Sequence, residues 1–158
     1  MAKKVTIIPP TSQFWLLKSE PDVFSWEMLK GRGARGEAWD GVRNYQARNN
    51  MRAMKIGDLG FFYHSNEGKE IVGILQICAP ARADPKDDTG TWDCVDVRAL
   101  CDLPNRVTLA QVKATPALAE MPLVTSMRLS VQPVAAAHWR VVCKMGGLDA
   151  RALNAALK

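Results

Sequence analysis

Four residues, NEGK at 66–69, separate two apolar segments, and this spacing constrains the fold more than any other feature of the sequence. The first segment, LGFFYHS at 59–65, carries aromatic rings, and the second, EIVGILQICA at 70–79, is almost entirely apolar. So short a connection joins antiparallel strands, because a parallel pair needs a much longer crossover. We therefore expect a β-hairpin over 59–79.

Further strands are predicted on both sides of this hairpin. QFWLLK at 13–18 is apolar on both faces, as an interior strand is. WDCVDVRAL at 92–100 alternates apolar and polar residues, which is typical of a half-buried strand. VTLAQVKA at 107–114 indicates a short strand that enters a helix, and PLVTSMRLSVQPV at 122–134 is a mixed segment that ends in a proline-bound turn.

Short helices are predicted around the strands. Ser25 is a suitable N-cap for a helix that ends at Gly31 or Gly33. A second helix is expected from about Arg43 to Met54. Its apolar side consists of residues at i, i+4 and i+7 spacing, namely Ala47, Met51 and Met54.

Two closing helices, 135–145 and 149–158, are expected on either side of the helix-stopping GGL at 146–148. Four or five strands with short helices around them, without regular βαβ alternation, predict a small α+β barrel. At 158 residues the chain suits one domain, which we place at 13–158 after an N-terminal tail at 1–12.

Charge and hydropathy limit the partners and the location. The formal net charge of +5 and the pI near 9.2 favour an anionic partner, although a merely basic surface would give the same values. No apolar run approaches the roughly 20 residues that span a bilayer, so no membrane association is expected. The stretch Val5–Ile8 is too short for a secretory signal. We expect a cytoplasmic protein, or a nuclear one in a eukaryote; the oligomeric state is not predicted.

The sequence carries no recognisable catalytic or metal-binding motif. The four cysteines contain no CxxC pair, and only two histidines are present. No GxSxG elbow, HExxH motif, Walker loop or GxGxxG fingerprint occurs. We therefore predict no catalytic residue, no metal site and no cofactor, and we favour binding over turnover.

Four polar-aromatic clusters lie at predicted strand ends or loops: WLLKSEP at 15–21, WDGVRN at 39–44, FFYHS at 61–65 and SVQP at 130–133. In the second cluster, Trp39 would be a flat platform for a planar ligand, and Gly41 would let the backbone approach it. The helix that follows, with Arg43 at its start, would favour a phosphate. Alternatively, Trp39 is a core residue and Arg43 pairs with Asp40.

The other clusters offer hydrogen-bonding groups. Glu20 could accept a hydrogen bond from the exocyclic amine of a base, or form an exposed ion pair in a turn. The amide of Gln132 could read a base edge, with Pro133 holding its backbone still. His64 is either an ordinary strand-end residue or a catalyst.

Taken in order, these clusters resemble the EVE domain family of the PUA-like superfamily. The resemblance rests on FWLLKSEPDVFSWEML, WDGVRNYQARNNMRAMKIGDLGFFYHSN, IVGI, the DP at 84–85, VDVRAL, LPNRVTLAQVKATPALAEMPLVTSMRLSVQPV and HW, which cover roughly 14–142. It implies a small, mostly antiparallel β-barrel flanked by short helices, and relatedness to YTH and ASCH domains. The loop at 83–92 is shorter than is usual in the family. The resemblance therefore leaves open whether this loop supplies a wall of the cage, a role in which Trp92 could substitute.

The resemblance also implies a function. It predicts a non-catalytic module that binds DNA or RNA and reads a modified base, with modified cytosine in DNA favoured, flipped into an aromatic pocket. Trp39 matches a cage wall, and the segment Lys18–Glu20 matches residues that hydrogen-bond the base. The full set of predicted ligand-binding residues is Trp15, Lys18, Ser19, Glu20, Trp39, Asp40, Gly41, Val42, Arg43, Asn44, Tyr63, His64, Ser65, Ser130 and Gln132.

Two other classes of function stay open. An ASCH-like hydrolase acting on RNA or nucleosides would use Lys18, Glu20 and His64. A plain interaction module would use the cleft for a protein partner.

Overall fold

The structure is a computed structural model that describes residues 13–149, 151 and 153. The expected tail at 1–12 and most of the expected closing helix at 149–158 lie outside the described residues. Among the helices of the described part, none is long and apolar enough to cross a membrane. The cytoplasmic or nuclear location stays a prediction.

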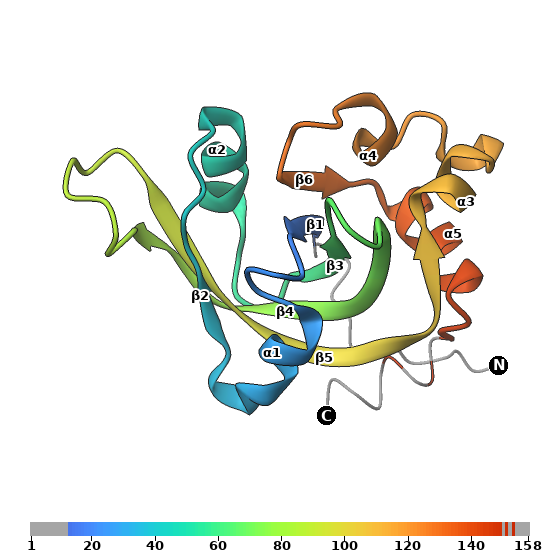
Figure 1. Ribbon diagram of the computed structural model, residues 1–158, viewed down its shortest axis with the longest axis horizontal. Coiled ribbons are helices and arrows are strands. Elements are labelled where there is room, and N and C mark those ends of the chain that lie inside the picture. The colour runs from blue at the N-terminus through green and yellow to red at the C-terminus, as the bar shows by residue number, and fades with distance from the viewer. Residues whose placement is uncertain (1–12, 150, 152, 154–158) are drawn as a thin grey trace, which may run out of the picture.

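Within residues 13–149, six strands form one sheet in the order β2-β5-β4-β3-β1-β6, with short helices around it (Figure 1). The strands are β1 Phe14–Ser19, β2 Glu37–Trp39, β3 Leu59–His64, β4 Glu70–Ala83, β5 Asp93–Thr108 and β6 Val131–Val134. The helices are α1 Trp26–Gly31, α2 Tyr45–Ala53, α3 Leu109–Lys113, α4 Pro122–Thr125 and α5 Ala136–Met145, with 3₁₀ turns η1 Gly33–Arg35 and η2 Pro116–Leu118. The predicted mixed α+β class is confirmed.

The hairpin predicted over 59–79 is confirmed. Strands β3 and β4 pair antiparallel, and the turn between them is sharp enough to give Asn66, Gly68 and Lys69 positive φ angles. Only β1 and β3 run parallel among the paired strands of the described residues, so the sheet is mostly antiparallel, as expected. Strands β4 and β5 are longer than the predicted 70–79 and 92–100, because their pairing continues across several register shifts.

The sheet is curved but does not close into the expected barrel. Strands β2 and β6 lie at opposite ends of the strand order, and within the described part of the chain no pairing joins them. Helix α2 contacts β4, β5 and β6, so it packs between the two ends of the sheet where a closed barrel would have strand pairing.

Each face of the sheet carries its own apolar core, because neighbouring residues of a strand point to opposite faces. Phe61 belongs to a core with Trp139, which we call the Trp139 cluster, and Phe62 belongs to a core with Trp39, the Trp39 cluster. This arrangement accounts for the predicted interior strand at 13–18: Leu16 packs into the first core and its neighbour in the second, so both faces of β1 are covered.

The predicted helix boundaries are largely confirmed. Ser25 caps α1 and accepts a hydrogen bond from the Met28 N–H at 3.1 Å, and the helix ends at Gly31. Helix α2 begins two residues later than expected, because Asn44 is its N-cap and accepts a hydrogen bond from the Ala47 N–H at 2.9 Å.

Tight packing holds α1 against the sheet. The Trp26 indole lies directly over Gly73 of β4, where a Cβ atom would fall 2.2 Å from the Trp26 ring. Its Nε1 donates to an Asp102 carboxylate oxygen at 2.6 Å. Glycine is therefore required at 73 by the close approach of a buried ring.

Candidate functional site

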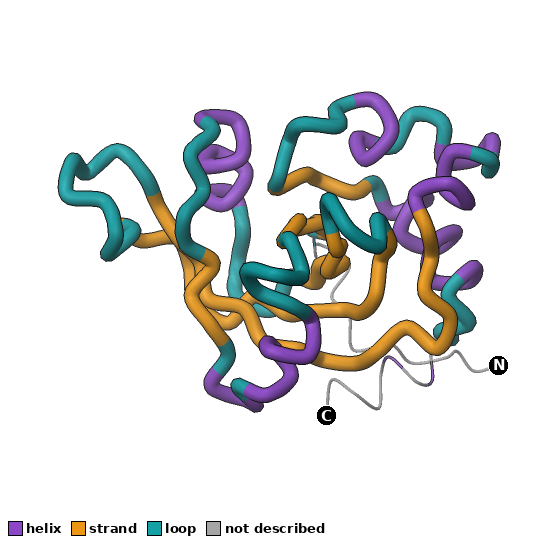
Figure 2. Tube along the Cα trace, in the orientation of Figure 1, coloured by secondary structure: helices purple, strands orange, loops and turns teal. Residues whose placement is uncertain are grey.

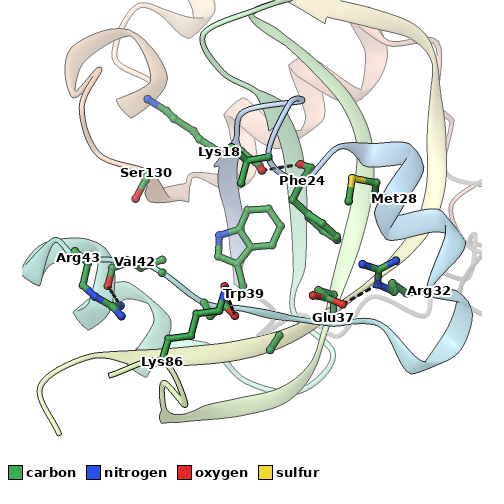
Figure 3. Close-up of a pocket in the computed structure, with 15 residues that line it drawn as sticks. Lys18, Phe24, Met28, Arg32, Glu37, Trp39, Val42, Arg43, Lys86 and Ser130 are labelled. Carbon is green, nitrogen blue, oxygen red and sulfur yellow. Dashed lines mark hydrogen bonds and ion pairs between the residues drawn. The ribbon is translucent and has the colours of Figure 1, made fainter. Parts of the chain in front are cut away.

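A hollow of about 410 Å³ opens where the ends of β1 and β2 meet the turn before α1 (Figure 3). This volume lies within the range of small-molecule sites, about 300–1,000 Å³. Eight residues predicted from the sequence line it: Lys18, Ser19, Trp39, Asp40, Gly41, Val42, Arg43 and Ser130. The sequence therefore identified segments from three separate parts of the chain that the fold brings together.

Trp39 is central among the residues that line this hollow, with Phe24 and Val42 on either side of it in Figure 3. Its side chain is only 7% exposed, and its indole meets the rings of Phe62 and Phe24 edge-to-face at 5.4 and 6.2 Å. No aromatic ring of the described residues stacks face-to-face on it. The two sequence interpretations thus combine: Trp39 packs into a core and also borders an open hollow.

Sequence reasoning missed the other residues of the lining, which come from the turn before α1, from α1 and the residue after it, from β2, and from the loop after β4. They are Val23, Phe24, Met28, Arg32, Glu37, Ala38 and Lys86. Strand β2, which ends at Trp39, is only three residues long and was not predicted. It forms because it pairs with Val95 and Val97 of β5, a contact that local sequence does not encode.

A buried carboxylate, Asp84, fixes the rim of the hollow. It is 1% exposed, and its Oδ2 accepts hydrogen bonds from the Gly41 N–H at 2.8 Å and from Arg43 Nη1 at 3.0 Å. Its Oδ1 accepts one from the Lys86 N–H at 2.8 Å. Burial alone would raise the pKa of Asp84, but these donors together hold that pKa below its usual value.

These contacts change the expected ion pairing. Arg43 pairs with Asp84, and Asp40 pairs instead with Lys86 at 3.2 Å, so the alternative Arg43–Asp40 pair is wrong. Asp84 belongs to the DP motif at 84–85, but nothing in the spacing predicted its contact with a segment 43 residues earlier.

The cations around the hollow outnumber the acids that line it. Among the described residues, the charged side chains that line it are Lys18, Arg32, Arg43 and Lys86 on one hand and Glu37 and Asp40 on the other. Arg32 pairs with Glu37 at 2.8 Å. Lys18 has no acidic partner in the described part of the chain; its Nζ donates to the Met127 carbonyl at 2.5 Å, and burial lowers its pKa.

Two hydroxyl groups lie beside Lys18. Ser19 Oγ donates to the Phe24 carbonyl at 2.6 Å and so keeps its acceptor capacity for a ligand. Ser130 lies on the same side of the hollow in Figure 3. The arrangement thus offers a flat ring, cationic groups and small hydrogen-bonding groups at one place.

Seven predicted residues do not line this hollow: Trp15, Glu20, Asn44, Tyr63, His64, Ser65 and Gln132. Trp15 is buried and its Nε1 donates to Asp58 Oδ2 at 3.0 Å. Gln132 is fully buried, and its Nε2 donates to the carbonyls of Ser126 and Leu129 at 3.1 and 2.9 Å. Its amide therefore holds the segment before β6 in place.

Tyr63 and Ser65 line a neighbouring hollow of about 170 Å³, which also includes Lys18. His64 Nε2 accepts a hydrogen bond from the Trp26 N–H at 3.1 Å, and burial, together with Arg106, lowers the pKa of its imidazole. Glu20 is exposed directly after β1, and its backbone carbonyl accepts hydrogen bonds from the N–H groups of Val23 and Phe24. The hydrolase hypothesis placed Lys18, Glu20 and His64 together, but only Lys18 lines the larger hollow.

Trp92, the substitute proposed for a cage wall, does not line the hollow either. Its ring lies against Tyr45 of α2, with the ring centroids 4.8 Å apart. Among the described residues, no group of three histidine, cysteine, aspartate or glutamate side chains has a geometry that could hold a metal ion.

Comparison with known proteins places this architecture among relatives. Human thymocyte nuclear protein 1 is 38% identical over an alignment 155 residues long, which covers 78% of this chain and 69% of that protein. The crystal structure of protein Atu2648 from Agrobacterium tumefaciens is 61% identical, with a TM-score of 0.84 over 87% of this chain and 94% of that one.

The crystal structure of human THYN1 in complex with 5-methylcytosine containing DNA is 34% identical, with a TM-score of 0.80 over 87% of this chain and 99% of that one. A YTH domain from Zygosaccharomyces rouxii, at 21% identity and a TM-score of 0.54, is similar in fold. The family model of the EVE domain matches residues 13–145, which is most of the chain. The resemblance seen in the sequence is therefore confirmed, and the chain belongs to the EVE domain family.

Proposed function

We propose that this protein is a non-catalytic nucleic-acid-binding module that reads a modified base, with 5-methylcytosine in DNA favoured, in the hollow beside Trp39. One observation carries the proposal: a hollow of about 410 Å³ is bordered by an indole on which no other described ring stacks, and is lined by more cations than acids. A flipped base offers a flat ring for the indole and a phosphate for the cations.

The similarity to human THYN1 supports the choice of ligand. That protein has been crystallised with 5-methylcytosine containing DNA, and its structure aligns with 87% of this chain.

Each side chain has a physical role in the proposed complex. Stacking of a base on an aromatic ring is worth about 1–3 kcal/mol, so Trp39 supplies the largest single contribution. Ser19 and Ser130 offer hydroxyl groups to the base edge. Arg43 and Lys86 line the hollow, and we assign them to the phosphates of the flipped nucleotide. This assignment predicts that the affinity falls as the salt concentration rises.

Magnitudes limit how selective such a site can be. A buried methyl group is worth about 0.8 kcal/mol, which corresponds to roughly a fourfold difference in affinity. Flipping a base out of a duplex costs a few kcal/mol. The fit of the hollow around the modified edge must therefore add to the contribution of the methyl group itself.

The test is a titration of the full chain with matched DNA oligonucleotides that contain one cytosine or one 5-methylcytosine, measured by fluorescence anisotropy. We expect tighter binding of the methylated strand by at least about fourfold. Trp39→Phe should reduce both the affinity and the difference between the two strands, because the smaller ring offers less stacking area.

The matched control is Trp139→Phe, which makes the same substitution at a tryptophan that is also buried but belongs to the other core. Any general loss of stability affects both variants, whereas a loss of affinity confined to Trp39→Phe reports the ligand. Equal affinity of wild type for both strands, unchanged in Trp39→Phe, would exclude the reader function.

A further inference from the structure

A second aromatic surface lies beside the hollow, and its two rings belong to neither apolar core. Tyr45, the first residue of α2, is 60% exposed, and its ring lies 4.8 Å from that of Trp92 at an interplanar angle of 36°. Trp92 is the last residue of the loop between β4 and β5, which projects at the left of Figure 2. We call this pair, with Arg48 against it, the Tyr45–Trp92 platform.

Guanidinium groups surround the platform. The Arg48 Cζ lies 5.0 Å from the centre of the Tyr45 ring and 5.9 Å from that of Trp92, within the range of cation–π attraction. Arg43, which lines the hollow, lies 5.8 Å from the Trp92 ring. Within the described residues Arg48 pairs with no carboxylate, because its nitrogens bond to the Asn49 side chain and the Thr91 carbonyl.

Hydrogen bonds link the loop that carries Trp92 to itself and to α2. Asp87 accepts hydrogen bonds from the Thr89 hydroxyl at 2.6 Å and from the backbone N–H of Trp92 at 2.8 Å. The Asp84 N–H donates to the Trp92 carbonyl at 3.0 Å, which closes the loop at its base. Arg48 Nη1 ties the loop to α2 through the Thr91 carbonyl at 3.0 Å. The two rings are thus presented by two elements that are fastened to each other.

We propose that the Tyr45–Trp92 platform is a second stacking subsite, which takes the nucleobase adjacent in the strand to the one in the hollow. This inference rests on the proposed function and extends it. Tyr45 is largely exposed and Trp92 is half-buried, so the ring pair offers stacking area to a base. The charge of Arg48, which no described carboxylate pairs with, suits the phosphate that links the two nucleotides. Arg43 connects the two subsites, since it lines the hollow and lies against Trp92.

The test uses the full chain and a short single-stranded DNA with one central 5-methylcytosine, together with two versions in which the nucleotide on its 5′ or its 3′ side is abasic. Tyr45→Ala and Trp92→Ala should each weaken binding of the intact strand by about 5- to 150-fold. The same variants should leave unchanged the affinity for the strand that lacks the base on the contacting side.

Three variants serve as controls. Tyr45→Phe keeps the ring and should bind like wild type. Ile56→Ala truncates a side chain that is 66% exposed elsewhere and should also bind like wild type. Trp39→Phe should lower methyl discrimination, which neither platform variant should change.

Unaltered affinity in both platform alanine variants would overturn the inference, and so would an equal loss for intact and abasic strands. The same strand with an unmodified central cytosine reports the reader function, which fails in a different way: wild type would then bind the methylated and unmodified strands equally. The two failures are therefore distinguishable in one set of titrations.

Discussion

Trp139 and Trp39 are both buried tryptophans packed against phenylalanines on opposite faces of one sheet, yet their rings are held differently. Phe14 and Phe61 stack on Trp139 at 4.5 and 4.0 Å, each with an interplanar angle of 18°. The rings nearest Trp39 instead meet it edge-to-face, at angles of 83° and 85°. Rings therefore stack face-to-face on Trp139, whereas no described ring stacks face-to-face on Trp39.

The difference shows how one side chain can serve both folding and binding. Edge-to-face contacts fix the plane of an indole while leaving room for a flat partner against it. Trp39 is held by rings of its own core and still borders a hollow, whereas Trp139 is enclosed by the sheet and by stacked rings. Rigid support from one side is what a stacking site requires, because a mobile ring would lose freedom on binding.

The largest expected effect compares alanine at the two tryptophans. Removing a large buried aromatic side chain costs about 3–5 kcal/mol, and the cost grows with the cavity left behind. We expect Trp139→Ala to fall near the upper end and Trp39→Ala near the lower end, because water from the adjoining hollow can fill the space at 39. Urea unfolding of the chain without DNA measures both. A larger loss at Trp39 than at Trp139 would contradict the contrast drawn between the clusters.

How much of this contrast was predictable depends on the range of the contacts involved. Phe61 and Phe62 lie in an apolar run, and such a run predicts a strand covered on both faces, which is what the two clusters are. Ser25 and the hairpin turn at 66–69 act within a few residues, so their roles follow from local sequence. Local signals of this kind predicted most helices and strands to within a few residues.

The missing parts depend on contacts between distant segments. Strand β2 forms because β5 pairs with it, and between the two ends of the sheet α2 packs where a closed barrel would have strand pairing. Gln132 looked like a ligand-reading amide, but its burial is set by the turn at 126–129 folding over it. Sequence spacing could place residues near a cleft, but it could not say which way each side chain faces.

The second prediction concerns how tightly the side chains of the Trp39 cluster pack beneath the hollow. Gly73→Ala should destabilise the chain by about 3 kcal/mol, because the new methyl group would overlap the Trp26 ring and overpacking of a core is costly. Gly31→Ala is the matched control, since nothing lies within 4 Å of its added Cβ and alanine favours a helix by up to about 1 kcal/mol. Chemical denaturation of both variants is the measurement. A tolerated Gly73→Ala would mean that this cluster is loose throughout, and the contrast with Trp139 would lose its basis.

The smallest predicted effect concerns the rim, where Asp84 fastens the segment after Trp39. Asp84→Asn should lower the free energy of unfolding by about 2 kcal/mol at pH 7, because a neutral amide cannot satisfy all three donors that face the carboxylate. Asp96→Asn is the control: it also loses an ion pair with an arginine, but a partly exposed one, which is worth under about 1 kcal/mol.

The pH dependence separates the charge of Asp84 from its shape. The pKa of the folded carboxyl lies below the ordinary 3.8, against the opposing effect of burial, because of the hydrogen bonds from Gly41, Lys86 and Arg43. Its contribution is therefore complete well above pH 3.8 and is lost as the pH falls through the lower folded value. Wild type and Asp84→Asn should thus converge in stability below pH 3.8, while Asp87, whose pKa is about 2, affects both equally and cancels in the difference. A gap between the two proteins that stays constant from pH 7 down to pH 2 would mean that the rim is held by packing, and the ionic tether from Asp84 to Arg43 would then have no part in shaping the open side of Trp39.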